Sequence, residues 1–314
     1  MKKDYIKLVS VISCIGLLAC LYQNMQLKQE IKNLRNALDT NYDYLENKVD
    51  RIYSDVDDML EREASLLSDY EWEYLDADFE KMEVSVLCRV TPKELDTGQT
   101  EAVLVYNEKE YPMELNQGTF ETEITAPLFE DSVVEKVMFR TGETLQTEML
   151  NWGLTPRHEY VTMVYGQYSG MGSGGVGSGD VLGWRMEGTV HVDIERKAAP
   201  VQVKSIALVE EIDGVEMNRT EIPSTALVSR EPMQYAYDLE RAFEIPAGST
   251  MELLVEVVDG ENLVHRSLVE RKVVTEEGDF DREAEEFGWW RAAEAEIYAA
   301  DGTPLFEIEL EEVY

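Results

Sequence analysis

The pattern of apolar and polar positions changes once along the chain, near Ser68. Before that point apolar residues recur at spacings of three and four, which is the period of an α-helix. After it they alternate with polar residues at the period of two that a β-strand imposes. The sequence therefore predicts a mainly β fold with an N-terminal α stalk.

The helical part carries an apolar seam with the heptad spacing of a coiled coil. The seam comprises Ile31, Leu34, Leu38, Tyr42, Leu45, Val49, Ile52, Val56 and Met59. We expect a coiled-coil stalk over residues 23–69 that makes the protein a homo-oligomer, either a dimer or a trimer. The alternative is a single helix that lays the same stripe on its own β-domain.

An uncharged stretch of 15 residues, 8–22, precedes the stalk. With Tyr5 and Ile6 added, it predicts a transmembrane signal anchor over 5–22, continuous with the coiled coil, behind a cytoplasmic tail of residues 1–4. The protein would then be single-pass in the cell membrane, with its N-terminus cytoplasmic and its bulk extracytoplasmic. The alternative is a lipoprotein anchored at Cys20, because Leu17-Leu18-Ala19-Cys20 resembles a bacterial lipobox.

The remainder of the chain predicts two antiparallel β-sandwich domains of the immunoglobulin-like kind, over 70–150 and 157–314, joined by a linker at 151–156. Strands of the first domain are expected near 84–90, 102–106, 111–115, 120–124, 133–139 and 144–150. Those of the second are expected near 159–168, 181–194, 201–210, 215–222, 234–244, 250–258, 263–274, 290–298 and 304–311. Asp-Gly pairs at 213–214, 259–260 and 301–302 predict hairpin turns, and a C-terminal hairpin ends the second domain.

Residues 169–179 hold six glycines and three serines. The stretch formally matches a dinucleotide-binding fingerprint, but a strand follows it where the fingerprint requires a helix N-terminus. We therefore expect a flexible loop, and its role stays open.

Charge and cysteine content narrow the range of partners. The net charge is −36, so a nucleic-acid partner is excluded, whereas cationic proteins, neutral or cationic glycans and divalent cations remain. Of three cysteines, Cys14 and Cys20 lie in the apolar segment, which leaves Cys88 alone in the rest of the chain. No disulfide within the β-domains is expected.

The candidate chemistry is sparse. His158, His191 and His265 have no metal-ligand spacing with each other or with cysteine, so surface histidines are expected. The sequence predicts no catalytic residue, no cofactor and no metal ligand. The adjacent Trp289 and Trp290 must face opposite sides of a strand, which makes one of them a candidate partner contact.

These features predict a non-enzymatic, membrane-anchored extracytoplasmic scaffold or interaction protein of a bacterial cell envelope. It would oligomerise through its coiled coil and present two β-domains to an unknown envelope protein or glycan. Two alternatives belong to other classes. One is an exported hydrolase that uses carboxylate catalysis, and the other is a calcium-dependent adhesin.

Overall fold

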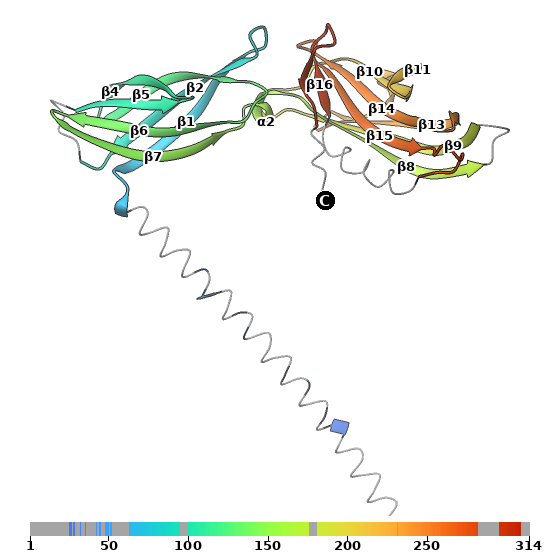
Figure 1. Cartoon of the computed structure of the whole chain (residues 1–314), viewed down its shortest axis with the longest axis horizontal. Helices are drawn as coiled ribbons and strands as arrows, with labels where there is room; N and C mark the ends of the chain where they lie inside the picture. Colours follow the sequence, from blue (N-terminus) through green and yellow to red (C-terminus); the bar gives the residue numbers. More distant parts are fainter. Residues whose placement is uncertain are drawn as a thin grey trace, which may run out of the picture. The chain divides into compact units, whose positions relative to one another are not determined.

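The computed structural model divides into two compact units, Met1–Ser68 and Asp69–Tyr314 (Figure 1). The residues that it describes are 25, 26, 28, 32, 35, 42, 44, 48, 49, 51, 63–94, 100–175, 181–230, 232–281 and 295–308.

The first unit corrects the prediction of a coiled-coil stalk over 23–69. Its described residues from 25 to 64 are helical, but none of them packs in a coiled coil. Tyr42 and Val49 of the predicted seam are 72% and 47% exposed. A heptad stripe is buried only against a second helix, and none lies against these two side chains in the described part of the chain. The other seam residues, Ile31, Leu34, Leu38, Leu45, Ile52, Val56 and Met59, lie outside the described residues.

The predicted transmembrane anchor over 5–22 is also wrong. Among the described residues, no helix has the length and the apolar character needed to cross a bilayer. The uncharged run of 15 residues is shorter than the roughly 20 that a span requires. The prediction of single-pass localisation is therefore wrong as well, whereas this finding does not test the lipoprotein alternative. Residues 1–4, the segment 5–22 and Cys20 lie outside the described residues.

The second unit begins with one sheet of seven strands in the order β1-β2-β5-β4-β3-β6-β7 (Figure 1). Its strands are β1 (Leu67–Asp78), β2 (Glu83–Pro92), β3 (Thr100–Tyr106), β4 (Lys109–Asn116), β5 (Thr119–Pro127), β6 (Ser132–Thr141) and β7 (Thr144–Leu154). The six strands predicted between 84 and 150 are confirmed. Strand β1 was missed, and it extends back to Leu67, into the segment predicted to be helical.

This sheet folds over itself to enclose an apolar core. Alternate residues of β2, including Val84, Val86 and Cys88, are completely buried. The ring of Phe120 on β5 lies 5.9 Å, centroid to centroid, from that of Phe139 on β6, although β4 and β3 separate these strands in the sheet. Burial raises the pKa of the Cys88 thiol to about 12. A β-sandwich is compatible with this packing, but one continuous sheet supplies both of its faces here.

The two edge strands of this sheet, β1 and β7, meet through aromatic rings. The Trp152 ring of β7 stacks on Tyr70 at 5.3 Å and on Trp72 at 5.6 Å, with interplanar angles of 21° and 20°. The backbone N–H of Thr155 donates to the Tyr74 hydroxyl at 2.8 Å. Trp152 is only 5% exposed, and no backbone ladder joins β1 to β7. The stacked rings of Tyr70, Trp72 and Trp152, called the aromatic seam below, therefore close the sheet.

The short helix α2 (Arg157–Tyr160) leads into two further sheets, ordered β11-β10-β14-β15-β16-β17 and β12-β13-β9-β8 (Figure 1). Their strands are β8 (Met163–Gly175), β9 (Val181–Glu195), β10 (Val203–Ile212), β11 (Val215–Glu221), β12 (Leu227–Arg230), β13 (Met233–Pro246), β14 (Thr250–Asp259), β15 (Val264–Val273), β16 (Glu296–Tyr298) and β17 (Pro304–Phe306). A 3-10 turn, η1 (Ser224–Ala226), precedes β12. Antiparallel pairing of β10 with β11, β14 with β15 and β16 with β17 confirms the three Asp-Gly hairpins.

One apolar core joins the two sheets. It includes Met186 and Val190 of β9 in the four-stranded sheet, and Leu208 of β10 and Leu253 of β14 in the six-stranded sheet. These residues obey the period of two that the sequence displays, with one face buried and the other turned outward. The arrangement is compatible with the predicted β-sandwich.

The glycine-rich stretch is not a loop as far as residue 175, because Ser169–Gly175 continue strand β8. A Cβ atom at Gly172 would lie 2.2 Å from the indole of Trp184, and one at Gly174 would lie 2.5 Å from the ring of Phe280. The glycines therefore make room for two aromatic rings that pack edge to face at 5.4 Å. The rest of the predicted loop, 176–179, lies outside the described residues.

We expect Gly172→Ala to destabilise the protein by about 1–3 kcal/mol, because the new methyl group overlaps the Trp184 ring. Gly175→Ala is the matched control. Gly175 lies on the same strand, and no atom lies within 4 Å of a Cβ added there. Urea denaturation followed by circular dichroism measures both variants. Equal stabilities for the two would contradict the packing described for β8.

Trp152→Ala is expected to lower the free energy of unfolding by about 3–5 kcal/mol, because it removes the buried ring that both β1 aromatics contact. Trp72→Ala is the control, since this indole is 38% exposed and covers only one side of the seam. It should cost clearly less in the same urea titration. An equal loss from both variants would show that Trp152 is not the residue that closes the sheet.

Candidate functional site

The predicted site residues are distributed unevenly. Trp289 and Trp290 lie outside the described residues. His191 is exposed on β9, as expected, and His158 is partly buried on α2. His265 is completely buried on β15, so its prediction as a surface residue is wrong. Its position between Val264 and Arg266 places it on the core-facing side of the strand.

His265 belongs to a buried polar network centred on Asp259. The Asp259 carboxylate accepts a hydrogen bond from the Thr162 hydroxyl at 3.0 Å and lies 3.0 Å from His265 Nε2. Its second oxygen accepts the backbone N–H groups of Glu261 and Leu263, at 3.1 and 3.0 Å. Asp259, His265 and Thr162 are at most 1% exposed. The carboxylate therefore fixes the turn between β14 and β15 from within.

Arg196 completes this network. Its guanidinium donates to both carboxylate oxygens of Glu261, at 2.9 and 2.7 Å, and to the Thr162 hydroxyl at 2.9 Å. It also lies 3.5 Å from the Asp259 carboxylate, with its side chain only 7% exposed. Two carboxylates thus face one guanidinium. The segment after β9 is tied in this way to the β14–β15 turn and to the residues after α2.

The electrostatics of the network favour a structural role. Burial alone would raise the pKa of Asp259, but the hydrogen bond and charge of His265, with the other donors, lower it below the ordinary value. An aspartate beside a histidine is a common acid–base arrangement. Here both side chains are 0% exposed, so no substrate can reach them.

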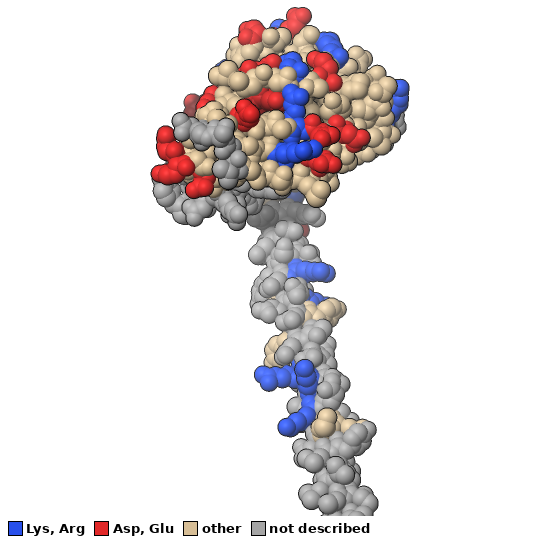
Figure 2. All heavy atoms as spheres, turned by 90° about the vertical axis from the view of Figure 1, so that its right-hand side faces the viewer, with Lys and Arg blue, Asp and Glu red and all other residues tan. Residues whose placement is uncertain are grey.

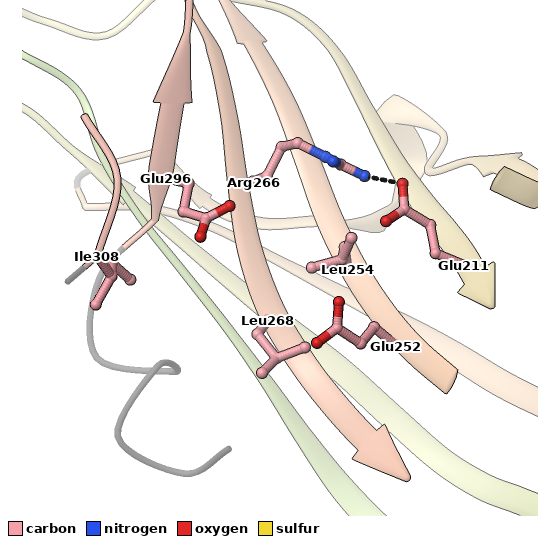
Figure 3. Close-up of a pocket in the computed structure, with 7 residues that line it drawn as sticks. All are labelled: Glu211, Glu252, Leu254, Arg266, Leu268, Glu296 and Ile308. Carbon is pink, nitrogen blue, oxygen red and sulfur yellow. Dashed lines mark hydrogen bonds and ion pairs between the residues drawn. The ribbon is translucent and has the colours of Figure 1, made fainter. Parts of the chain in front are cut away.

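A small cavity lies instead on the outer side of the six-stranded sheet (Figure 3). Its volume is about 140 Å³, below the ~300–1,000 Å³ of most small-molecule pockets. Strands β10, β14, β15 and β16 and the segment after β17 contribute its lining. The lining residues are Glu211, Glu252, Leu254, Arg266, Leu268, Glu296 and Ile308.

The polar groups of the cavity are held by specific partners. Figure 3 shows the Arg266 guanidinium directed at the Glu211 carboxylate, to which it donates a hydrogen bond. Burial lowers the pKa of Arg266, but the hydrogen bond to Glu211 and the charges of Glu211 and Glu256 together outweigh it, so the net shift of the pKa is upward. Glu296 accepts a hydrogen bond from the Tyr298 hydroxyl at 2.8 Å. Burial, reinforced by Glu296, raises the pKa of Tyr298 to about 12, so the phenol keeps its proton.

The lining combines an apolar floor with an excess of negative charge. Leu254 and Leu268 are 8% and 7% exposed and belong to a small apolar cluster on this side of the sheet, and Ile308 lines the cavity beside them. The lining has three glutamates and one arginine, and Arg271, outside the lining, lies 3.5 Å from Glu252. The site can therefore hold a cationic group on an aliphatic stem, with the stem on the leucines and the charge beside the carboxylates.

The surrounding surface also leaves no excess of positive charge. On the face seen in Figure 2, Lys and Arg side chains gather in a row bordered by Asp and Glu. Several arginines of this β-region are tied to carboxylates: Arg219 donates to Glu216 at 2.9 Å and to Glu256 at 2.7 Å, and Arg241 donates to Glu210 at 2.6 Å. With these cations paired, the surplus of acidic residues determines the field around the protein.

Sequence reasoning missed the cavity because its residues come from four strands and the C-terminal segment. One signal was present in β10, where Glu211 follows the apolar run Ile206–Val209. A register shift between Glu210 and Glu211 places Glu211 at 7% exposure. A carboxylate at a buried strand position is the feature that could have marked the site.

Two further observations bear on function. Within the part of the chain that the structure describes, no group of three or more His, Cys, Asp or Glu side chains is placed to hold a metal ion. No protein family matches the chain, and no relative is found among the curated proteins. The assignment of function therefore rests on the geometry of these residues.

Asp259→Asn is expected to lower the free energy of unfolding at neutral pH by about 1–3 kcal/mol, because it weakens the hydrogen bonds to the buried carboxylate. The folded-state pKa of Asp259 lies below the unfolded value of about 3.9. Its stabilisation is therefore present above that pH and is lost as the pH falls through the folded pKa. The variant should show a weaker loss of stability in acid.

Urea titrations between neutral pH and the acid range test this expectation. Asp301→Asn is the matched control, because Asp301 opens another Asp-Gly turn and accepts a backbone N–H from Thr303 at 3.0 Å, yet it is exposed. It should leave stability nearly unchanged. The same acid dependence in wild type and Asp259→Asn would rule out Asp259 as its source.

Proposed function

We propose that this protein is a non-catalytic interaction protein that binds a cationic segment of another protein. The observation that carries the proposal is the cavity on the six-stranded sheet, whose three carboxylates lie around an apolar floor. Its size suits one lysine or arginine side chain better than a metabolite. The outer side of this sheet would be the recognition surface.

The chemistry of the cavity supports a cation on a long stem. An ammonium or guanidinium group gains charge-assisted hydrogen bonds from Glu252 and Glu296, and its methylenes cover Leu254 and Leu268. Each carboxylate already has a partner within the protein: Glu211 binds Arg266, Glu252 lies 3.5 Å from Arg271 Nε, and Glu296 accepts the Tyr298 hydroxyl. A second cation in the site would therefore share these carboxylates with their present partners.

The charge of the whole chain supports the same class of partner. A net charge of −36 attracts a basic protein over distances of about a Debye length and repels anionic ones. Such steering raises the association rate, and the cavity then selects the side chain that docks. Binding should therefore weaken as ionic strength rises.

The other expected partners have less support in the described residues. For a glycan, the candidates Trp289 and Trp290 lie outside the described residues, so that alternative stays a prediction. A calcium-dependent adhesin would need a group of oxygen ligands, which the described residues do not provide. The expectation that the protein is not an enzyme stays a prediction, as does its hydrolase alternative.

Fluorescence anisotropy with a labelled oligolysine peptide tests the proposal. The double variant Glu252→Gln/Glu296→Gln is expected to weaken binding by at least about tenfold, which corresponds to about 1.4 kcal/mol. The matched control is the double variant Glu240→Gln/Glu187→Gln, which removes the same charge around Arg185 on the other sheet. The same peptide with its lysines acetylated should not bind.

Equal weakening by the two double variants would mean that the peptide responds to net charge and not to the cavity, and the proposal would fail. Binding of the acetylated peptide would contradict it as well. The proposal would be supported most directly if, at raised salt, the control variant still bound the peptide and the cavity variant did not.

A further inference from the structure

We propose, beyond the function above, that the outer edge of strand β7 is a dimerisation surface that pairs with β7 of a second copy of this chain. The strand lies at the end of the seven-stranded sheet, and among the described residues only β6 pairs with it. It has 11 residues, about twice the mean length of a strand. A long, unpaired edge is a template for another strand.

The edge of β7 lacks the charged residues that β1, the opposite edge of the same sheet, carries. Strand β1, at the opposite end of the sheet, carries the acids Asp69, Glu71, Glu73, Asp76 and Asp78. In β7, residues 144–151 contain one charged residue, Glu148, and no lysine or proline. Charged residues and proline are the usual means of preventing pairing at an edge. Their scarcity here marks β7 as competent to pair.

Apolar side chains are exposed on this same stretch. Leu145 and Met149 are 55% and 59% exposed. They lie opposite Arg140 and Lys136 of β6, on the outer side of the sheet, whereas Gln146 lies opposite the buried Phe139. Leu145, Thr147 and Met149 therefore share one face of the strand.

The sequence of the strand is self-complementary when it is paired antiparallel to itself about Thr147. In that register Leu145 faces Met149 of the second copy, and Thr147 faces its own counterpart. Gln146 faces Glu148 of the second copy, so an amide meets a carboxylate. Apolar pairs and Thr–Thr pairs are favourable across antiparallel strands. The neighbouring register about Glu148 would place two carboxylates face to face, which the strand avoids by pairing about Thr147.

The geometry limits the interface to the first part of β7. Beyond Met149 the register against β6 shifts, and Asn151 adopts a left-handed conformation with φ of 50°. The strand then directs Trp152 into the aromatic seam with β1. Residues 144–149 therefore lie before the register shift, where β6 is the only described strand paired with β7, and a twofold axis through Thr147 uses this segment in both copies.

The charge of the chain sets the conditions for association. Two copies that each carry −36 repel one another, and salt screens this repulsion. Dimerisation through backbone pairing and apolar contacts should therefore strengthen as salt increases. This response is opposite in sign to that of the cationic partner, so the two interactions can be tested independently.

Sedimentation velocity of the full-length chain over a range of concentrations and salt tests the inference. Thr147→Lys and Met149→Lys are expected to raise the dissociation constant of the dimer by at least about tenfold. Met217→Lys is the matched control, because Met217 is 62% exposed on β11, the edge strand of another sheet. It should associate like the wild type.

A charge-complementation experiment separates lost pairing from misfolding. Thr147→Lys and Thr147→Glu should each be monomeric, and their equimolar mixture should form a mixed dimer, because opposite charges then meet on the axis. A wild-type protein that stays monomeric at high salt would overturn the inference. Association that is unchanged in Thr147→Lys, or a mixture that stays monomeric, would do so equally.

Discussion

The first β-region depends on a single ring, the indole of Trp152. The sheet begins with β1 and ends with β7, and no backbone ladder joins these edges. Stacking of Trp152 on Tyr70 and Trp72 closes the curl, so that the rings of Phe120 and Phe139 are enclosed. Burial of large aromatic rings is among the strongest terms available to a small core. The two ends of β7 therefore differ: Trp152 is fixed in the aromatic seam, whereas residues 144–149 pair only with β6 among the described strands.

The second β-region separates its core from its recognition surface by strand alternation. Leu208 on β10 and Leu253 on β14 point inward to the apolar core, while Glu211 and Glu252 on the same two strands line the outer cavity. A cavity built from neighbouring strands keeps its shape only if their connections are fixed. The buried Asp259 carboxylate holds the β14–β15 turn, and these two strands supply most of the cavity. The buried Asp259 carboxylate thereby stabilises the solvent-exposed surface that carries the cavity.

Period-two alternation predicted most of the strands because each burial pattern is local; Val84, Val86 and Cys88 show it within a few residues. The Asp-Gly turns were equally local. The coiled-coil prediction from the heptad seam was wrong because an apolar stripe shows which face of a helix is apolar, but not that a second helix covers that face. The glycines of β8 were misinterpreted because the rings that require them, Trp184 and Phe280, are distant in sequence. The cavity was beyond sequence reasoning for the same reason, since pairing alone brings its glutamates together.

The buried Cys88 thiol makes the opening of the first β-region measurable. Cys88 is 0% exposed and burial raises its pKa to about 12, so the thiol keeps its proton at neutral pH. An alkylating reagent can modify it only after β2 has separated from the strands that cover it. The rate of alkylation then reports how often this sheet opens, and no introduced cysteine is needed to measure it. Local opening of the seven-stranded sheet is measured in this way while the rest of the chain stays folded.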